Sequence, residues 1–425
     1  MSTPASTLEH RYRLIVSAGV FLFFALLFIV RSGYSYGAGL LFLTSLVYLT
    51  LHRATLQQAQ WRLSREDKAL MGVLLVFALT ASASVLGHGN NIKHLDQLSR
   101  YLLGIPVLFL LLRFPPGLNA LWSGAALGVT LSIGIAAWQL YVLDHVRAAG
   151  YLNIIHFGNI GLVFGLICAA GLRWAAAQGQ ASRRWRFALA IGLLASVYAV
   201  IASGSRGSWL ALPPVLLIFL VAFVSRRAAP YLAAAVVISL ALAAVLYLIP
   251  ETGIQERLQL AITEIQRYLN ERYVFRDGEV SSVGARLEIW RVAMLAIPQS
   301  LWLGWNEARF DAFVSGLIQQ GLADPYMQNM ANTHNNYLEV VLLHGLVGLI
   351  PLLALFLVPL ALFCRRLRAT DPTVQALALA GASFIAAYMM FGVSQVILGR
   401  NNGVIFFVLT LSILWSALRH AETRQ

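Results

Sequence analysis

The chain has 425 residues, of which 59% are hydrophobic and only 12% are charged. Soluble domains carry about 25% charged residues, so this composition excludes a soluble globular protein and predicts a chain built mainly from membrane-spanning helices. The formal net charge is +13. Because the arginines concentrate in short segments between apolar runs, we interpret this charge as an orientation signal and expect no nucleic-acid partner.

Apolar runs bounded by charged, proline or glycine positions predict about twelve membrane-spanning helices. The predicted spans are roughly Leu14–Val30, Tyr36–Leu51, Ala69–Gly87, Leu98–Leu112, Leu118–Val142, Leu152–Leu172, Phe187–Ser203, Trp209–Val224, Tyr231–Ile249, Asn335–Phe363, Thr373–Val396 and Val404–Leu418. We therefore expect an all-α polytopic membrane protein with nine helices in residues 1–249, a helical loop at 250–334 and three helices in 335–425. The first span reads as a retained helix and not as a cleavable signal peptide.

The distribution of lysine and arginine predicts the orientation. With the N-terminus inside, most basic residues fall in the inner segments, as the positive-inside rule requires. The short outer segments hold only Arg31, Lys93, Arg100, Arg147, Arg206 and Arg400. We expect both termini in the cytoplasm, multiple passes through the membrane, and the long loop and the site on the outer side.

The long loop carries ten acidic residues and seven arginines. Apolar residues recur at helical spacing in Gln255–Tyr273, Ala285–Ile297 and Asn306–Leu322, so we expect a compact helical cap on the outer surface of the bundle. Trp302 and Trp305 resemble anchors at the membrane interface.

Polar residues gather where the sixth predicted span begins. Arg147 precedes Asn153, His156 and Asn159, and Asn153 and His156 share a helix face. Polar groups within a membrane helix suggest a functional site, although hydrogen bonds between helices explain them almost as well.

Arg206 lies in an outer turn of small residues, 203–208, directly before the span that Trp209 opens. Backbone N–H groups at a helix start together with a guanidinium make a good site for an oxyanion such as phosphate. Arg286 similarly falls near a predicted helix start within the loop. The alternatives are an incidental arginine that reaches for water at position 206 and a solvated arginine at position 286.

His334 is a candidate general base. Asn332 or Thr333 is expected to cap the helix that follows, which would put His334 in the first turn, where the helix dipole keeps the imidazole neutral. The alternative is a polar capping residue at a membrane boundary. Asn335 is expected to orient the ring or to bind hydroxyl groups, and Glu339, one turn further on, to form a structural salt bridge.

The sequence predicts no metal site and no cofactor. His334 and His344 are ten residues apart, about 15 Å along a helix, which is too far for one ion. Asp277 and Glu279 form the only close acidic pair on the outer side, and we interpret it as a solvated turn. Cys168 and Cys364 imply neither a disulfide nor a metal site.

Three short motifs carry a family resemblance. His334-Asn335 followed by Gly345-Leu346-Val347-Gly348 resembles the signature of bacterial O-antigen ligases. The turn Ser205-Arg206-Gly207 and the segment 286–290, Arg-Leu-Glu-Ile-Trp, are also similar to that superfamily, as are about twelve helices with one large loop just before the histidine. The superfamily also includes O-antigen polymerases and protein O-oligosaccharyltransferases.

The resemblance implies a place in the inner membrane of a bacterium, with the long loop and the site facing the periplasm, and it implies a reaction. Ligases of this family transfer a polysaccharide from undecaprenyl pyrophosphate to a sugar of the lipid A core, and the expected partners are this donor, this acceptor and membrane lipids. His334 would be the catalytic base, and the substrate-binding residues would be Arg206, Arg286, Arg147, Asn335 and His156. A base-assisted single displacement of this kind inverts the anomeric carbon and needs no metal.

Other functions remain open. A polymerase usually has two substantial external loops, whereas one is predicted here, and the oligosaccharyltransferases often extend beyond the last helix. A transporter or flippase of lipid-linked glycans also suits twelve spans. No paired broken helices or internal repeat favour that class.

Overall fold

The computed structural model describes residues 4–51, 63–223, 248, 254–272, 274–276 and 279–423. The predicted span Tyr231–Ile249 lies outside these residues except for Leu248, and Asp277 of the acidic turn also lies outside them.

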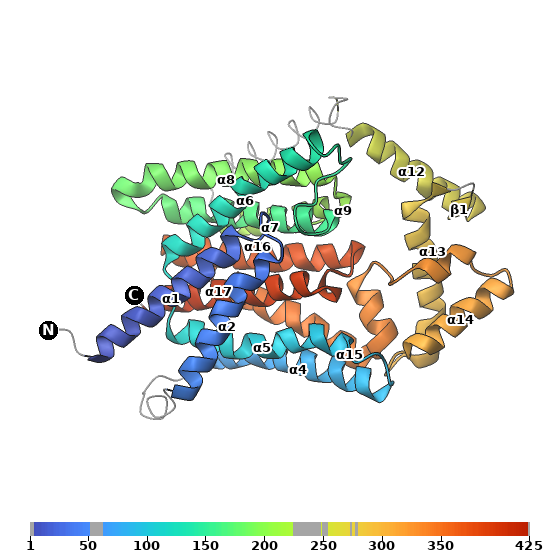
Figure 1. Ribbon diagram of the computed structural model, residues 1–425, viewed down its shortest axis with the longest axis horizontal. Coiled ribbons are helices and arrows are strands. Elements are labelled where there is room, and N and C mark those ends of the chain that lie inside the picture. The colour runs from blue at the N-terminus through green and yellow to red at the C-terminus, as the bar shows by residue number, and fades with distance from the viewer. Residues whose placement is uncertain are drawn as a thin grey trace.

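A bundle of long helices forms most of the molecule (Figure 1). Its helices are α1 (Pro4–Ala25), α2 (Gly33–Leu51), α4 (Arg65–Gly87), α5 (His94–Arg113), α6 (Leu118–Tyr141), α7 (Ile154–Ala175), α8 (Ser182–Ser203), α9 (Arg206–Trp209), α10 (Leu212–Phe223), α15 (Asn336–Cys364), α16 (Pro372–Ser394) and α17 (Asn401–Glu422), with the 3-10 turns η1 (Gly179–Ala181) and η5 (Ile397–Gly399). Within the described residues, ten helices are long and apolar enough to cross a membrane. The protein is therefore an all-α multi-pass membrane protein, as predicted.

Two predicted spans differ from the helices observed. In place of Leu14–Val30, α1 begins at Pro4 and ends at Ala25, and an ion pair of 2.9 Å between Glu9 and Arg13 supports its polar first turns. In place of the short Leu98–Leu112, α5 has 20 residues and contains Pro106. Neighbouring helices make an internal proline tolerable in a membrane bundle.

The centre of the bundle consists of α7, α16 and α17, most of whose residues are buried. Aromatic rings from separate helices meet there. Phe406 of α17 stacks on Phe164 of α7 with 5.8 Å between ring centroids, and Phe384 of α16 meets Phe407 at 5.6 Å. This packing fixes the start of α17 relative to α7 and α16.

A cap, defined as residues 254–335, covers one end of the bundle (Figure 1). Its elements are α12 (Ile254–Glu271), β1 (Phe275–Arg276), β2 (Glu279–Val280), α13 (Ser282–Ala296), η3 (Ile297–Ser300), α14 (Glu307–Gln319) and η4 (Pro325–Asn329). The three helices expected in the loop are confirmed within a few residues. The two short strands, which were not predicted, pair antiparallel with Phe275 opposite Val280.

The cap is fastened to a break in α15. Gly345 has a φ of 61° and a ψ of −163°, a conformation that interrupts the helix. The freed N–H groups of Leu346 and Val347 donate to the carbonyls of Leu301 and Trp302 in the cap, at 2.9 and 3.2 Å. A Cβ atom at position 345 would collide with the Trp302 carbonyl. Gly345, the first glycine of the Gly-x-x-Gly motif, therefore allows the cap to pack closely against α15.

Trp305 is not the interfacial anchor that its position suggested. Its side chain is 3% exposed, and its Nε1 donates to the Ala296 carbonyl at 2.9 Å. The indole belongs to the contact between cap and bundle, because it packs with Ala293 and with Leu342 of α15. Trp302 is 65% exposed.

The end of the bundle where α1 begins and α17 ends, called the terminal end, carries a network of ion pairs. Arg366 contacts Glu66 and Glu422, each at 2.5 Å. Arg419 also contacts Glu422 at 2.5 Å, and it approaches Asp67 at 3.5 Å. Each of these arginines thus faces at least one carboxylate.

Candidate functional site

His334 does not lie in the first turn of α15, so that prediction is wrong. The helix begins at Asn336, and its N-cap is Asn335, whose Oδ1 accepts from the N–H groups of Tyr337 and Leu338 at 2.9 and 3.1 Å. His334 precedes the cap with a φ of 52°, in the left-handed region. This conformation excludes it from the helix, and Asn332 and Thr333 therefore do not cap α15.

The backbone around His334 is held on both sides. The His334 N–H donates to Asn332 Oδ1 at 2.9 Å, and the Thr333 N–H donates to Glu339 Oε2 at 2.8 Å. Trp290 of α13 donates from Nε1 to the Thr333 carbonyl at 2.8 Å. A non-glycine residue in the left-handed region costs about 1–3 kcal/mol, so these bonds are needed to keep the imidazole in place.

Glu339 thus has a different partner from the one predicted. Among the described residues it forms no salt bridge, and its carboxylate accepts from a backbone amide of the His334 segment.

The imidazole of His334 is fixed in one tautomer. Its Nδ1 lies 2.8 Å from Gln395 Oε1, at the end of α16. Because an amide oxygen only accepts, Nδ1 must donate, which leaves Nε2 with its lone pair. Burial lowers the pKa of His334; the Gln395 contact opposes this shift, and the charges of Arg286 and Arg400 reinforce it. The ring is therefore neutral near pH 7, with Nε2 able to accept a proton.

Arg286 and Arg206 lie near each other, although one belongs to the cap and the other to the bundle. Arg286 follows the N-terminal turn of α13 and is partly buried. Burial lowers the pKa of Arg286, the charge of Arg206 lowers it further, and Glu264 raises it. No described carboxylate forms an ion pair with either guanidinium. Two neighbouring arginines that form no such ion pair suit a doubly charged anion.

The next residues of the Arg286 motif stabilise the cap. Glu288 is 1% exposed and accepts from Tyr268 Oη of α12 at 2.7 Å and from Arg291 Nη2 at 2.6 Å. This buried carboxylate ties α12 to α13, and so holds the helix that carries Arg286.

The turn that carries Arg206 is built by hydrogen bonds. Gly204 ends α8 with a φ of 58°, and Ser205 is the N-cap of the four-residue α9. Asn159 of α7 accepts from Ser208 Oγ at 2.8 Å. Arg147 donates to the Ser203 carbonyl at 2.6 Å and to the Gly204 carbonyl at 3.1 Å. In this arrangement Arg147 positions the turn, and its predicted contact with substrate stays a prediction.

His156 is fully buried between α7 and α17. Its Nδ1 lies 3.0 Å from Asn402 Oδ1, and its Nε2 has no hydrogen-bond partner. Asn153 caps α7 by accepting from the His156 N–H at 2.7 Å. The ring thus supports the start of α17, and the substrate contacts predicted for His156 and Asn335 stay predictions.

Two residues of the site were missed from the sequence. Gln395 orients the His334 ring, and Arg400 is exposed at the start of α17, close enough to lower the pKa of His334. Both lie in the link 395–402, which begins with Gln395, ends with Arg400, Asn401 and Asn402, and joins two apolar spans. The polar residues at the two ends of this link, with Arg400 on the outer side, are the signal that could have identified them.

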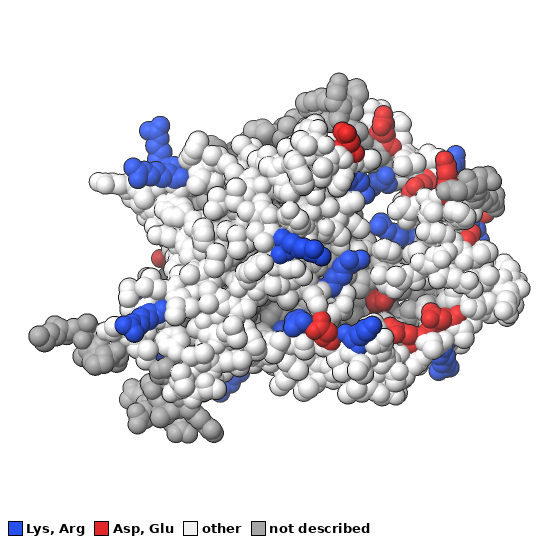
Figure 2. All heavy atoms as spheres, viewed as in Figure 1, with Lys and Arg blue, Asp and Glu red and all other residues white. Residues whose placement is uncertain are grey.

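The site borders a cavity of about 220 Å³. Gln395, Arg400 and Asn332 line it together with residues of α4, α5, α14 and α15. In Figure 2, basic side chains gather near the middle of the visible face, and most of the visible acidic ones lie toward the cap.

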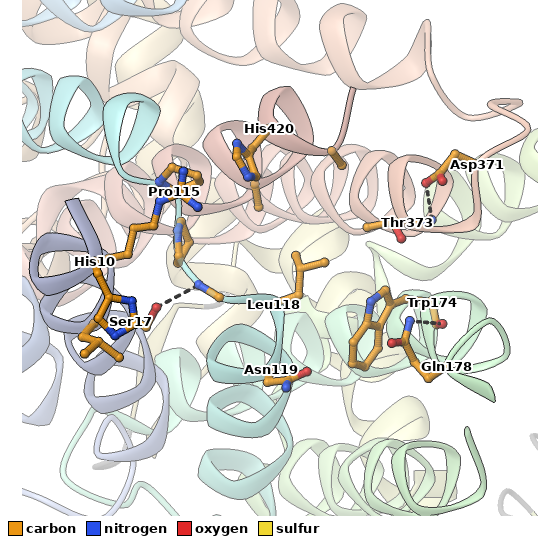
Figure 3. Close-up of a pocket in the computed structure, with 16 residues that line it drawn as sticks. His10, Ser17, Pro115, Leu118, Asn119, Trp174, Gln178, Asp371, Thr373 and His420 are labelled. Atoms are coloured by element: carbon orange, nitrogen blue, oxygen red, sulfur yellow. Dashed lines mark hydrogen bonds between the residues drawn. The ribbon is translucent and has the colours of Figure 1, made fainter. Parts of the chain in front are cut away.

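A larger cavity, of about 440 Å³, opens at the terminal end (Figure 3). Several of its polar groups serve the fold: Ser17 accepts from the Gly117 N–H and Asp371 from the Thr373 N–H, each at 2.8 Å. His420 lines it from the last turn of α17, about 30 Å along that helix from Arg400. This cavity is therefore separate from the site around His334.

The described residues contain no group of three His, Cys, Asp or Glu placed to hold a metal ion. The charged groups that lower the pKa of His334 are the guanidinium ions of Arg286 and Arg400, which supply fixed positive charge.

Comparison with known proteins shows a family similarity over part of the chain. Residues 191–353 match the family model described as O-antigen ligase. Over 405 residues, the chain is also 26% identical to a Haemophilus influenzae protein whose description names no activity, covering 94% of this chain and 97% of the relative. The matched region contains Arg206, Arg286 and His334. Over this region the chain is therefore similar to O-antigen ligases.

Proposed function

We propose that this protein is an O-antigen ligase, which transfers a polysaccharide from undecaprenyl pyrophosphate to a sugar hydroxyl of the lipid A core. The observation that supports this proposal is the position of the His334 imidazole relative to the arginines. A neutral imidazole with the lone pair of Nε2 available lies near Arg286 and Arg400, and Arg206 lies near Arg286; none of the three arginines forms an ion pair with a described carboxylate. A base beside fixed positive charge suits attack by a hydroxyl with departure of a pyrophosphate.

The reaction is a single displacement. His334 Nε2 removes the proton from the acceptor hydroxyl as its oxygen attacks the anomeric carbon of the donor glycan. The bond between that carbon and the pyrophosphate oxygen breaks, and the electron pair leaves with undecaprenyl pyrophosphate. Arg206 and Arg286 stabilise the developing negative charge, and Gln395 holds the imidazolium as it forms. Attack opposite the leaving group inverts the anomeric carbon.

We also propose that no divalent cation takes part. Many enzymes that act on lipid phosphates use a metal to neutralise the leaving group, and here the guanidinium ions would take that role. Purified protein should transfer glycan in excess EDTA to a soluble core oligosaccharide, whose use avoids effects of cations on lipid dispersion. Strict dependence on added Mg²⁺ or Mn²⁺ would overturn this part of the mechanism.

The site is proposed to face the periplasm, with both termini in the cytoplasm, because the basic residues concentrate at the other side of the bundle. Gln320 in the cap and Arg184 between α7 and the body of α8 are both exposed and suit cysteine labelling. In a Cys364→Ser background, Gln320→Cys should react with a membrane-impermeant thiol reagent on intact spheroplasts, and Arg184→Cys only after lysis. The reverse pattern would overturn the orientation.

The lipopolysaccharide of a deletion strain tests the function. We expect core-lipid A without polymer and an accumulation of polymer on undecaprenyl pyrophosphate, both reversed by the wild-type gene. Core that carries a single repeat unit would instead show a polymerase, and unchanged lipopolysaccharide with altered glycoproteins would show a protein O-oligosaccharyltransferase.

A further inference from the structure

We propose that the cavity of about 220 Å³ between α4, α5, α14 and α15 is the subsite for one uncharged sugar ring of the acceptor. This inference rests on the proposed function, because it assigns the second substrate of the same site. Pockets that enclose drug-sized ligands have volumes of about 300–1,000 Å³, so this smaller cavity fits a single ring and not a chain of sugars.

The position of the cavity suits the acceptor. Gln395, which holds the His334 ring, lines it, as do Asn332 and Arg400. Arg206 and Arg286 are not among its lining residues; they lie on α9 and α13. The two groups of residues therefore offer separate places for the two substrates; His334 itself does not line the cavity and adjoins it through Gln395.

The lining of the cavity suits sugar hydroxyls better than the donor's pyrophosphate, because two carboxyl side chains lie in it beside the single guanidinium of Arg400. Glu307 and Glu339 both line it. Two carboxylates would repel a phosphate, whereas carboxylates readily accept hydrogen bonds from sugar hydroxyls. Glu307 Oε1 lies 2.9 Å from His94 Nε2, so one oxygen of this carboxylate is already oriented.

Two buried polar groups of the cavity lack partners. Tyr101 is 1% exposed and Asn336 is 2% exposed, and both line the cavity. Neither Tyr101 Oη nor Asn336 Nδ2 has a hydrogen-bond partner. Leaving such groups unpaired costs about 1–3 kcal/mol each, and a bound ring with several hydroxyls would satisfy them. Phe77 adds an aromatic wall of the kind that packs on the apolar face of a sugar.

Tyr101→Phe is the sharpest test, because it removes only the unpartnered hydroxyl. A purely structural tyrosine would tolerate this change, since no hydrogen bond is lost in the free protein. We expect the dissociation constant for delipidated core oligosaccharide to rise about 5-fold. Glu307→Gln should raise it about 10-fold, because a charged acceptor is lost. Tyr36→Phe and Glu256→Gln are matched controls at exposed positions outside the cavity.

Binding is measured on the purified full-length protein in detergent, separately for the oligosaccharide and for undecaprenyl pyrophosphate. The expected result is weaker oligosaccharide binding by Tyr101→Phe and Glu307→Gln, with pyrophosphate binding unchanged within twofold. Ala331→Trp, which narrows the exposed rim, should act in the same way. Oligosaccharide binding that is absent, or insensitive to all three changes, would overturn the subsite. Failure of the wild-type protein to bind undecaprenyl pyrophosphate would instead overturn the proposed function.

Discussion

The two ends of the bundle use arginine differently. At the terminal end, Arg366 and Arg419 each contact carboxylates at 2.5 Å. At the His334 end, Arg206, Arg286 and Arg400 form no ion pair with any described carboxylate. A partly buried charge without a partner is unfavourable, and such charges concentrate at functional sites. The comparison teaches that the first group holds helices together, whereas the second stays available for the anion that we propose as substrate.

The same contrast appears in the backbone. Asp371 caps α16 at the terminal end, where its Oδ1 accepts from Thr373 and Val374 in an ordinary helix start. At the other end, the chain keeps His334 in the left-handed region directly before the N-cap of α15. The unfavourable conformation thus occurs where the chemistry is proposed.

Replacing His334 by alanine should have the largest effect on activity. Loss of a general base typically costs ~10²–10⁴-fold in rate, so transfer should fall by that amount while the protein still enters the membrane. Initial rates with purified protein and matched expression levels measure this. Near-normal transfer by a well-expressed variant would remove His334 from the mechanism.

The second-largest effect is expected at the arginines of the His334 end. Arg206→Lys and Arg286→Lys should each lower kcat/KM by about 10-fold, because lysine keeps the charge but cannot form a two-pronged contact with phosphate. Their thermal unfolding should stay close to wild type, since no ion pair is lost. Full activity of both lysine variants would show that net charge alone matters.

At the terminal end, replacing an arginine should lower the stability of the protein and leave its activity nearly unchanged. Arg366→Ala removes the partner of Glu66 and Glu422, so we expect a loss of stability of about 2 kcal/mol, below the range for fully buried pairs because these side chains are 14–26% exposed. Thermal unfolding in detergent measures this, and activity per folded molecule should stay within about twofold. A selective loss of activity would break the comparison.

The smallest expected effect is on pH dependence. Because the pKa of His334 is lowered, Nε2 stays unprotonated as the pH falls through the ordinary histidine value of about 6.5, and kcat/KM should decline only below it. Removing a nearby positive charge with Arg400→Gln should raise the pKa and move the acid limb to higher pH. Gln395→Glu should also raise the pKa of His334 and move the acid limb to higher pH. Identical acid limbs in wild type and both variants would mean that another group controls the profile.

The architecture could be predicted from the sequence because apolar length and charged boundaries are local signals. The three cap helices followed from apolar spacing, and the family motifs led to Arg206, Arg286 and His334. The conformation of His334 could not be predicted. It depends on competition among Asn332, Thr333 and Asn335 for the capping role, which Asn335 wins because the other side chains bind elsewhere.

Contacts between distant segments also could not be predicted from the sequence. Gln395 lies 61 positions from His334, and no local pattern joins them. Arg147 looked like a free outer arginine, but the fold places it on the carbonyls of Ser203 and Gly204. Trp305 was predicted to be an interfacial anchor. It is buried instead, because the cap docks on α15.

Equilibrium binding of undecaprenyl pyrophosphate to wild type, Arg286→Ala and Arg366→Ala tests the central claim most directly. Binding requires no turnover, and both variants lose one arginine from the same chain. The account predicts that Arg286→Ala weakens binding by about 10-fold or more, while Arg366→Ala binds as tightly as wild type under conditions in which it stays folded. Equal binding by all three proteins, or a loss confined to Arg366→Ala, would contradict it.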